Sequence, residues 1–322
     1  MSASDRSPSE PSPSASRRDF LQQAASLAAG VAALTPAVAA DTKAAQPPLP
    51  TIKLGPHTVT RLILGGNPIY GYSHFNKHLS QHLIDWHTPE HVQQLLKRAE
   101  QAGINTWQNS YAERTLQDLD RYRDAGGKMN WLCLGKGDWD QKPERIDEAA
   151  KRKPIGIAPH GALAERLHRQ DKLMVLTDLL KRIRDKGVLV GLSAHNPDLI
   201  ALANDKGWDV DYFMCCLYYL TRPREEYQKL LGSDLPLGEI YLPSDPPRMF
   251  KVIQATKKPC LAYKILAAGR RVGTPAEVRA AFTTALENIK PTDAMIVGMY
   301  QQFGDQVGDN TTLVRELCEK KR

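Results

Sequence analysis

Short apolar runs alternate with longer amphipathic stretches along the chain, and eight such runs occur between residues 61 and 298. This alternation is typical of βα units, in which helices connect parallel strands. Eight strands are the number that a closed (β/α)₈ barrel needs, and a barrel of roughly 250 residues nearly uses up a chain of 322. We therefore expect a (β/α)₈ barrel with strands at 61–66, 104–110, 130–136, 154–159, 188–193, 210–217, 260–265 and 294–298.

Helix-capping signals fall between the expected strands. Thr88 precedes a proline, and Thr274 is followed three residues later by Glu277, which is the spacing of a capping box. Two connections are long, 67–87 after the first strand and 221–244 after the sixth. Both leave the carboxyl ends of strands, where barrel active sites form, so we expect them to act as lids or binding loops.

The first fifty residues have a different composition from the rest. Ser16-Arg17-Arg18-Asp19-Phe20-Leu21 resembles a twin-arginine export signal, and an Ala-rich stretch to residue 40 ends in a small-x-small cleavage pattern. We predict a signal peptide at 1–40, a linker at 41–50 and the barrel at 51–322. The expected partner is the twin-arginine export machinery, and the expected location is the periplasm or the extracellular space. The stretch is too weakly apolar for a stable membrane anchor.

Charge and cysteine content narrow the class of protein. The net charge of +7 is spread without a dense Lys/Arg stripe between aromatic residues, so we expect a small-molecule substrate and no nucleic acid. The cysteine count is odd, and four of the five lie in expected strands. Buried free thiols are therefore expected, not a disulfide framework.

An ordered series of motifs resembles the aldo-keto reductases. Residues 51–66 are similar to the opening of that family, where a β-hairpin plugs the barrel floor and a strand ends in glycine. No single motif is strong, but the matches follow the family's order over about residues 51–316. The further matches are Gly103–Trp107, Leu134-Gly135-Lys136, His160, Gly191-Leu192-Ser193, Ala262–Gly269, Ile296-Val297-Gly298 and Asn310.

The resemblance implies a site in which a tyrosine protonates a carbonyl while a nicotinamide cofactor delivers hydride. Lys136 and His160 match the family's lysine and histidine, and Gln108 stands where the family has an aspartate. Tyr111 is the nearest candidate for the tyrosine, although it falls about two positions early. A cation beside a phenol stabilises the phenolate, which is why this chemistry pairs lysine with tyrosine.

The same resemblance implies a cofactor-binding set. Residues 299–303 read Met-Tyr-Gln-Gln-Phe and lack the basic side chains that hold a 2′-phosphate in the family. Any nucleotide is thus expected to be NAD(H), held tightly in an exported protein. The cofactor-binding candidates are Ser193, Gly298 and Asn310.

Amide, imidazole, ammonium and phenol groups follow the strand ends and suit a polyhydroxylated ligand such as a sugar. Three functions stay open: reduction of a carbohydrate or other hydroxy-carbonyl compound, a nicotinamide-independent lyase or isomerase using Lys136, His160 and His195, or sugar binding by a decayed site. His74, His78 and His82 are spaced by four, but no acidic third ligand lies nearby, so no metal is expected. The substrate-binding candidates are Asn67, Asn109, His195, Asn196, Tyr218 and Lys264.

Overall fold

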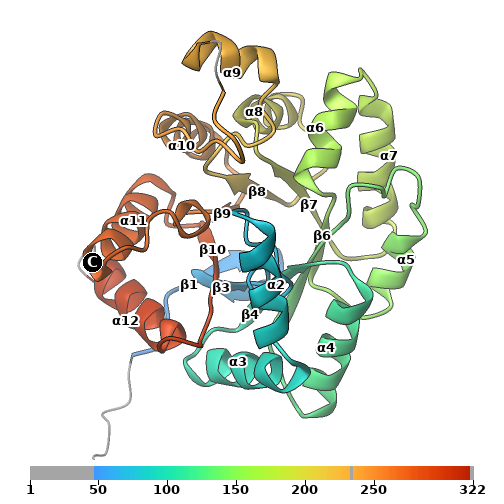
Figure 1. Ribbon diagram of the computed structural model, residues 1–322. Helices are drawn as coiled ribbons and strands as arrows, with labels where there is room; N and C mark the ends of the chain where they lie inside the picture. Colours follow the sequence, from blue (N-terminus) through green and yellow to red (C-terminus); the bar gives the residue numbers. More distant parts are fainter. Residues whose placement is uncertain (1–46, 233–234, 320–322) are drawn as a thin grey trace, which may run out of the picture. The chain divides into compact units, whose positions relative to one another are not determined.

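Eight parallel strands form a closed barrel in the computed structural model, which describes residues 47–232 and 235–319 (Figure 1). The expected signal peptide lies outside the described residues. Each strand falls within an expected run or extends it by one residue, so the predicted (β/α)₈ barrel is confirmed. In barrel order the strands are β10 (Ala294–Gly298), β3 (Leu62–Gly65), β4 (Thr106–Ser110), β5 (Asn130–Leu134), β6 (Gly156–Ala158), β7 (Leu189–Ala194), β8 (Tyr212–Cys216) and β9 (Cys260–Tyr263).

Strand alternation divides the apolar residues into two cores. Trp131 and Cys133 of β5 face the helices, whereas Leu132 between them faces the barrel interior. Tyr212 fills the lumen beside two glycines: a Cβ at Gly156 or Gly191 would lie 2.9 Å or 2.4 Å from the Tyr212 ring. The barrel is therefore a packed core below its mouth.

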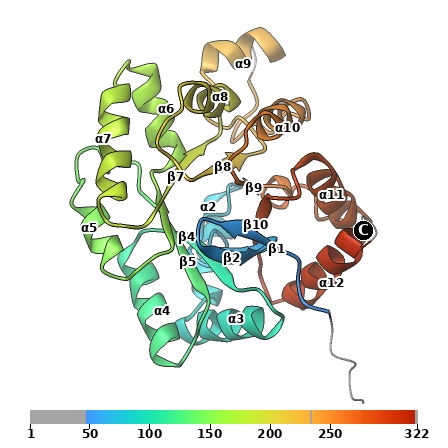
Figure 2. The ribbon, with the colours of Figure 1, turned by 180° about the vertical axis from the view of Figure 1, so that it is seen from behind.

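A hairpin precedes the barrel, as the sequence predicts. β1 (Thr51–Leu54) and β2 (His57–Thr60) pair antiparallel and lie across one end of the barrel when it is seen from behind (Figure 2). Their residues Ile52, Leu54 and Val59 belong to the inner core. The hairpin closes the floor, which leaves the carboxyl ends of the strands as the open face.

Helices surround the barrel, and the predicted caps form. The Thr88 side chain accepts from the His91 amide at 3.3 Å, and Thr274 accepts from the Glu277 amide at 3.2 Å. The helices are α2 (Lys77–Trp86), α3 (Pro89–Gln101), α4 (Glu113–Asp124), α5 (Arg145–Ala150), α6 (Gly161–Arg169), α7 (Leu173–Arg184), α8 (Pro197–Asp205), α9 (Arg224–Leu231), α10 (Asp245–Ala255), the 3₁₀ turn η1 (Ala267–Gly269), α11 (Pro275–Asn288) and α12 (Gln306–Glu319).

Each long connection carries a helix of its own. α2 lies in the first and passes over the open face of the barrel, while α9 lies in the second (Figure 1). The five cysteines are free thiols, four of them buried, as expected. Among the helices of the described ranges, none is long and apolar enough to cross a membrane.

Candidate functional site

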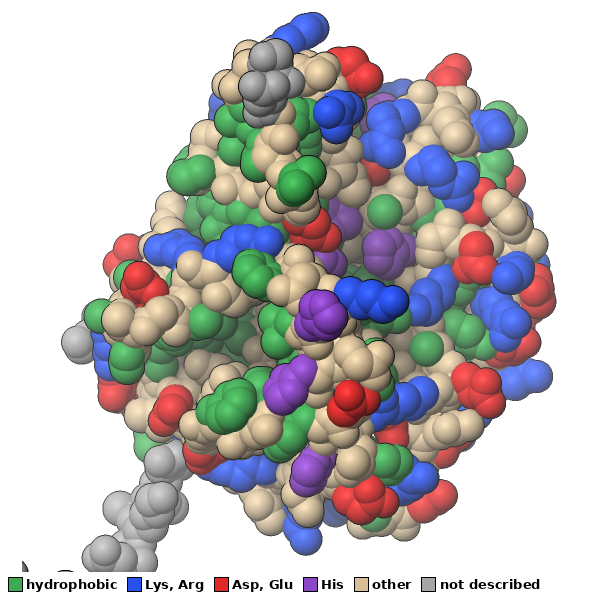
Figure 3. All heavy atoms as spheres, in the orientation of Figure 1, with side chains coloured by type: hydrophobic (Ala, Val, Ile, Leu, Met, Phe, Trp, Pro, Cys, Tyr) green, Lys and Arg blue, Asp and Glu red, His purple; other side chains and the backbone are tan. Residues whose placement is uncertain are grey.

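A cavity of about 1090 Å³ opens at the carboxyl ends of the strands. Leu79 and Leu83 of α2 line its roof, and the far part runs between α11 and α12 along Val278 and Leu313. Histidine side chains gather around the hollow near the centre of this face (Figure 3). The volume slightly exceeds the roughly 300–1,000 Å³ typical of small-molecule sites, so the cavity has room for more than a monosaccharide.

Nine residues predicted for the site line this one cavity. They occupy inward-facing positions at strand ends or in the loops that follow, together with one position on α12, and so they converge although they are distant in sequence. They are Asn67, Gln108, Lys136, His160, Ser193, His195, Lys264, Gly298 and Asn310. Lys136 and His160 thus face the same cavity, as the sequence comparison led us to expect.

Two predicted residues near β4 lie outside the cavity because of strand alternation. Asn109 faces the helix layer, where its side-chain oxygen accepts from the Trp131 indole at 2.7 Å. Tyr111 packs against Trp139, and its hydroxyl hydrogen-bonds Glu148. Burial and the Glu148 contact raise the pKa of Tyr111. This geometry does not suit the proton donor that we expected Tyr111 to be.

Two further predicted residues have other contacts. Asn196 caps α8, because its side-chain oxygen accepts from the Asp198 amide at 3.0 Å. Tyr218 is buried in the outer core with its ring centroid 4.9 Å from that of Tyr241. Neither lines the cavity, so the ligand-binding role expected for these two side chains has no geometric support.

A tyrosine from the first long connection takes the position beside Lys136. The Lys136 ammonium donates to the Tyr72 hydroxyl at 2.7 Å and lies 5.2 Å from the centre of that ring. An ammonium group has no acceptor site, so the phenol oxygen is the acceptor and its own proton stays available to a ligand. Tyr72 lines the cavity and is 39% exposed, which leaves the hydroxyl accessible.

His160 lies at the amino end of α6 with one ring nitrogen engaged. Its Nδ1 accepts from the Ala162 amide at 3.2 Å, so the neutral ring carries its proton on Nε2. Burial, with the nearby His195 and Lys136, lowers the pKa of His160 to about 4. The ring is therefore neutral at pH 7 and acts as a hydrogen-bond donor from Nε2.

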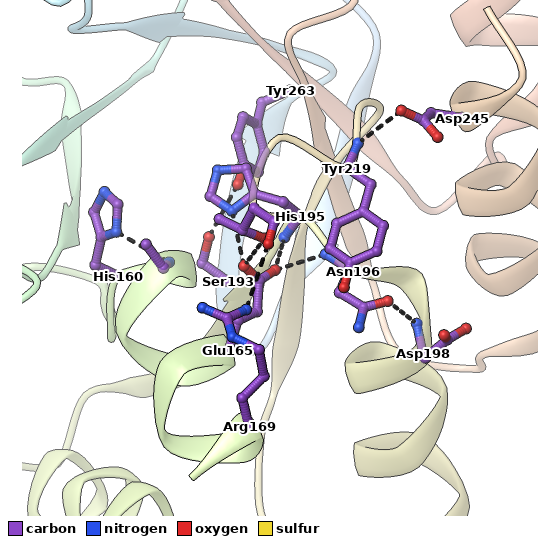
Figure 4. Close-up of polar contacts among 12 residues, drawn as sticks. His160, Glu165, Arg169, Ser193, His195, Asn196, Asp198, Tyr219, Asp245 and Tyr263 are labelled. Carbon is purple, nitrogen blue, oxygen red and sulfur yellow. Dashed lines mark hydrogen bonds and ion pairs between the residues drawn. The ribbon is translucent and has the colours of Figure 1, made fainter. Parts of the chain in front are cut away.

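Glu165 and His195 form a buried acid–imidazole pair close to His160 (Figure 4). The carboxylate is 1% exposed and lies 3.4 Å from His195 Nδ1. It also accepts from the Asn196 amide at 2.6 Å, the His195 amide and the Thr221 hydroxyl. Burial opposes ionisation, but these hydrogen bonds, led by His195, prevail and lower the pKa of Glu165.

The pairing fixes the His195 ring. An ionised carboxylate only accepts, so Nδ1 carries a proton and Nε2 is the ring nitrogen left for a ligand. Gly161 makes room for the ring, since a Cβ there would lie 3.1 Å from His195 Cε1 and Nδ1. His195 is 6.4 Å from His160 between ring centroids, so two imidazoles with different roles share one wall.

Lys264 follows β9 in a backbone conformation rare for a non-glycine residue, with φ at 61°. Such conformations cost about 1–3 kcal/mol and cluster at functional sites. The half-buried side chain lines the cavity and has no hydrogen-bond partner within the described ranges. Burial lowers the pKa of Lys264, although Cys216 and Glu239 act in the opposite direction.

The far part of the cavity offers polar groups suited to a nucleotide. Asn310 is 6% exposed and has no side-chain hydrogen bond to the rest of the described chain. Asp309 lines the same groove, and Arg279 pairs with Glu316 across it at 2.6 Å. A carboxylate such as that of Asp309 suits ribose hydroxyls, so these residues could hold a nucleotide.

The loop histidines have separate contacts. His74 precedes α2 and bridges Asn67 and Glu239, while His82 contacts Tyr300. Because His74 is not on the helix, the three histidines spaced by four do not share one helix face. Over residues 47–232 and 235–319, no group of three or more His, Cys, Asp or Glu side chains is placed to hold a metal ion.

Sequence reasoning missed Tyr72, Glu165 and Thr221. Tyr72 lies in a loop whose path could not be deduced from residue patterns. Glu165 did carry a signal, because it is an acidic residue among the apolar positions of the helix that starts at His160. A carboxylate in the second turn of a helix that starts at the barrel mouth lies close to the next strand end.

Comparison with known proteins identifies the fold. No protein-family model matches the chain, and no curated protein matches it. Among solved structures, a truncated 3-deoxy-D-arabino-heptulosonate 7-phosphate synthase from Thermotoga maritima is 12% identical, with 85% of this chain and 93% of that chain covered and a TM-score of 0.51. The glycerol dehydrogenase from Gluconobacter oxydans, an aldo-keto reductase, is 11% identical. The match covers 84% of this chain and 95% of that chain, with a TM-score of 0.49. At such identities the likeness concerns architecture, and the chain is a (β/α)₈ barrel of the kind that many enzymes share.

Proposed function

We propose that this protein is an exported oxidoreductase that interconverts a carbonyl and a hydroxyl group on a carbohydrate or similar hydroxy-carbonyl compound. The observation that carries the proposal is the Lys136–Tyr72 hydrogen bond of 2.7 Å inside the cavity. It supplies the lysine–tyrosine pair that carbonyl reduction needs, with the tyrosine from the loop after the first barrel strand. The cofactor is NAD(H), which supplies or accepts the hydride when bound.

Three side chains have distinct roles in this reaction. The Tyr72 hydroxyl donates its proton to the carbonyl oxygen, and the Lys136 ammonium stabilises the phenolate that forms. The neutral His160 ring donates a hydrogen bond from Nε2 and orients the same oxygen. Asn310, Asp309 and the groove between α11 and α12 hold the nucleotide.

The test replaces Tyr72 and measures NADH-dependent reduction of a panel of hydroxyketones and aldoses. Tyr72→Phe should lower turnover by about 10²–10⁴-fold, the usual contribution of a positioned acid. Tyr70→Phe is the matched control, because the Tyr70 hydroxyl contacts Asp118 at 3.2 Å outside the cavity. Equal turnover by the wild type and Tyr72→Phe would overturn the assignment.

A second candidate function is a lyase or isomerase that works without nicotinamide. The specific observation in its favour is the Glu165–His195 pair, which resembles the arrangement of a general base held by a carboxylate. Carbonyl reduction by Tyr72 and Lys136 does not need this pair. Turnover of a keto-sugar by the purified protein without added or bound nucleotide would favour the second candidate.

A further inference from the structure

Lys264 and His195 line the same cavity, with the buried Glu165 paired to His195, but none of the three has a part in the proposed reduction. Lys264 differs from Lys136, whose ammonium is held by the Tyr72 hydroxyl. The Lys264 backbone has a positive φ, which is rare for a non-glycine residue. Its side chain is half-buried and has no hydrogen-bond partner among the described residues. No hydrogen bond or ion pair among the described residues therefore gives the Lys264 ammonium a structural role.

We propose that Lys264 is a nucleophilic amine that captures keto or aldehyde substrates as an imine, with His195 as the proton-transfer group. The inference rests on the second candidate function and needs no nicotinamide. The substrate class is a small hydroxyketone or 2-keto acid, because the polar groups of the cavity suit hydroxyl and carboxylate oxygens. Lys136 and the His160 Nε2 donor lie in the same cavity and can hold such oxygens.

The chemical step balances with the groups present. The Nζ lone pair of the neutral amine attacks the carbonyl carbon, and one proton passes from nitrogen to oxygen, giving a carbinolamine. His195 Nε2 has by then taken the proton that the Lys264 ammonium released on becoming the neutral amine. It gives this proton to the hydroxyl, which leaves as water, and the C=N bond forms as an iminium. The neutral His195 Nε2 can next take a proton from the adjacent carbon, and that electron pair moves toward nitrogen to form an enamine.

The environment favours the reactive form of the amine. Only the neutral amine is nucleophilic, and burial lowers the pKa of Lys264. Each unit by which a lysine pKa falls raises the neutral fraction about tenfold near neutral pH. Glu165 positions His195 with Nε2 free, so the proton carrier shares the cavity with the amine.

The experiment traps the imine by reduction. Purified protein is incubated at pH 7 with dihydroxyacetone or pyruvate and cyanoborohydride, without nucleotide, and the modified lysine is located by peptide mass spectrometry. We expect Lys264 to be labelled faster than an exposed lysine such as Lys229, because burial lowers the pKa of Lys264. Labelling of Lys264 should level off at a lower pH than that of surface lysines.

Two variants sharpen the result. Lys264→Arg keeps a basic side chain and should lose the fast adduct, whereas Lys229→Arg, the same change at an exposed lysine outside the cavity, should leave the Lys264 adduct unchanged. Because the adduct is mapped on the wild-type chain, the test does not depend on how a variant folds. An adduct on Lys136, uniform labelling of surface lysines, or no adduct would overturn the inference.

The outcomes separate this inference from the function on which it rests. If His195→Asn abolishes nucleotide-free turnover of a keto-sugar while no lysine is trapped, the second candidate stands and the imine is wrong. If Lys264 is trapped but no substrate is turned over, the imine stands and the second candidate fails. Loss of NADH-dependent reduction in Tyr72→Phe is independent of both results.

Discussion

Replacing Glu165 by glutamine removes one oxygen and one charge from the buried pair without changing its size. In the native site one oxygen accepts from the His195 and Asn196 amides, and the other faces the Thr221 hydroxyl and His195 Nδ1. The glutamine carbonyl can keep both amides. The glutamine NH₂ group then faces two partners. The Thr221 hydroxyl can rotate and accept a hydrogen bond from it, but the protonated Nδ1 of His195 cannot accept one.

The magnitude follows from this count of contacts. One charge-assisted hydrogen bond is lost, so the free energy of unfolding should fall by about 1.5–3 kcal/mol. The His195 proton is driven from Nδ1 to Nε2, because Nδ1 must now accept from the amide. Nε2 is then a donor and cannot act as a base. Any reaction that uses His195 should slow by about 10²–10⁴-fold.

Two assays check the prediction for Glu165→Gln. Urea unfolding measures the stability change, and nucleotide-free turnover or the rate of imine trapping measures the chemistry. Glu148→Gln is the control, because the Glu148 carboxylate is also held by side-chain hydrogen bonds, but its partners Tyr111 and Arg145 do not line the cavity as His195 does. Turnover within about twofold of wild type in Glu165→Gln would refute the role of the pair.

The remaining predictions concern pH, cofactor choice and export. His160 has a folded pKa of about 4 against the ordinary 6.5, so its contribution to unfolding free energy is complete above pH 6.5 and is lost as the pH falls toward 4. In His160→Asn this pH-dependent part of the unfolding free energy should be absent. Urea unfolding of the wild type and the variant at pH 7 and pH 5 measures the difference. Glu316→Gln frees Arg279 for a 2′-phosphate and should raise NADP affinity about tenfold with little change for NAD, as measured by calorimetry. Arg17→Lys with Arg18→Lys should leave uncleaved protein in the cytoplasm, and normal periplasmic accumulation on a blot would contradict the export signal.

The fold could be predicted because its signals are local and repeated. Most barrel strands are short apolar runs, and caps such as Thr88 and Thr274 mark helix starts by side-chain chemistry alone. The inward-facing residues at strand ends followed from the same pattern. Lys136 and His160 could therefore be assigned to one cavity, although the sequence alone indicates no direct contact between them.

The parts of the site that escaped prediction depend on loop paths and on strand phase. Asn109 was assigned to the mouth because it lies at a strand end, and Tyr111 because it is the nearest candidate for the family's tyrosine, but alternation turns both side chains toward the helix layer. Tyr72 reaches Lys136 only through the course of a long loop, which residue spacing does not encode. Asn196 precedes a proline, as a helix cap often does, and in the structure it caps α8. From sequence alone, an amide at a strand end is equally suited to bind a ligand.

Transfer of deuterium from 4-deuterated NADH to the product tests the proposed reduction most directly. Wild-type protein is incubated with the labelled nucleotide and a panel of hydroxyketones and aldoses, and the products are analysed by mass spectrometry. We predict a deuterated alcohol with wild type and Tyr70→Phe, and its loss with Tyr72→Phe, since the Tyr72 hydroxyl accepts from Lys136 in the cavity whereas the Tyr70 hydroxyl contacts Asp118. No label in any product, or unchanged label transfer in Tyr72→Phe, would contradict the account.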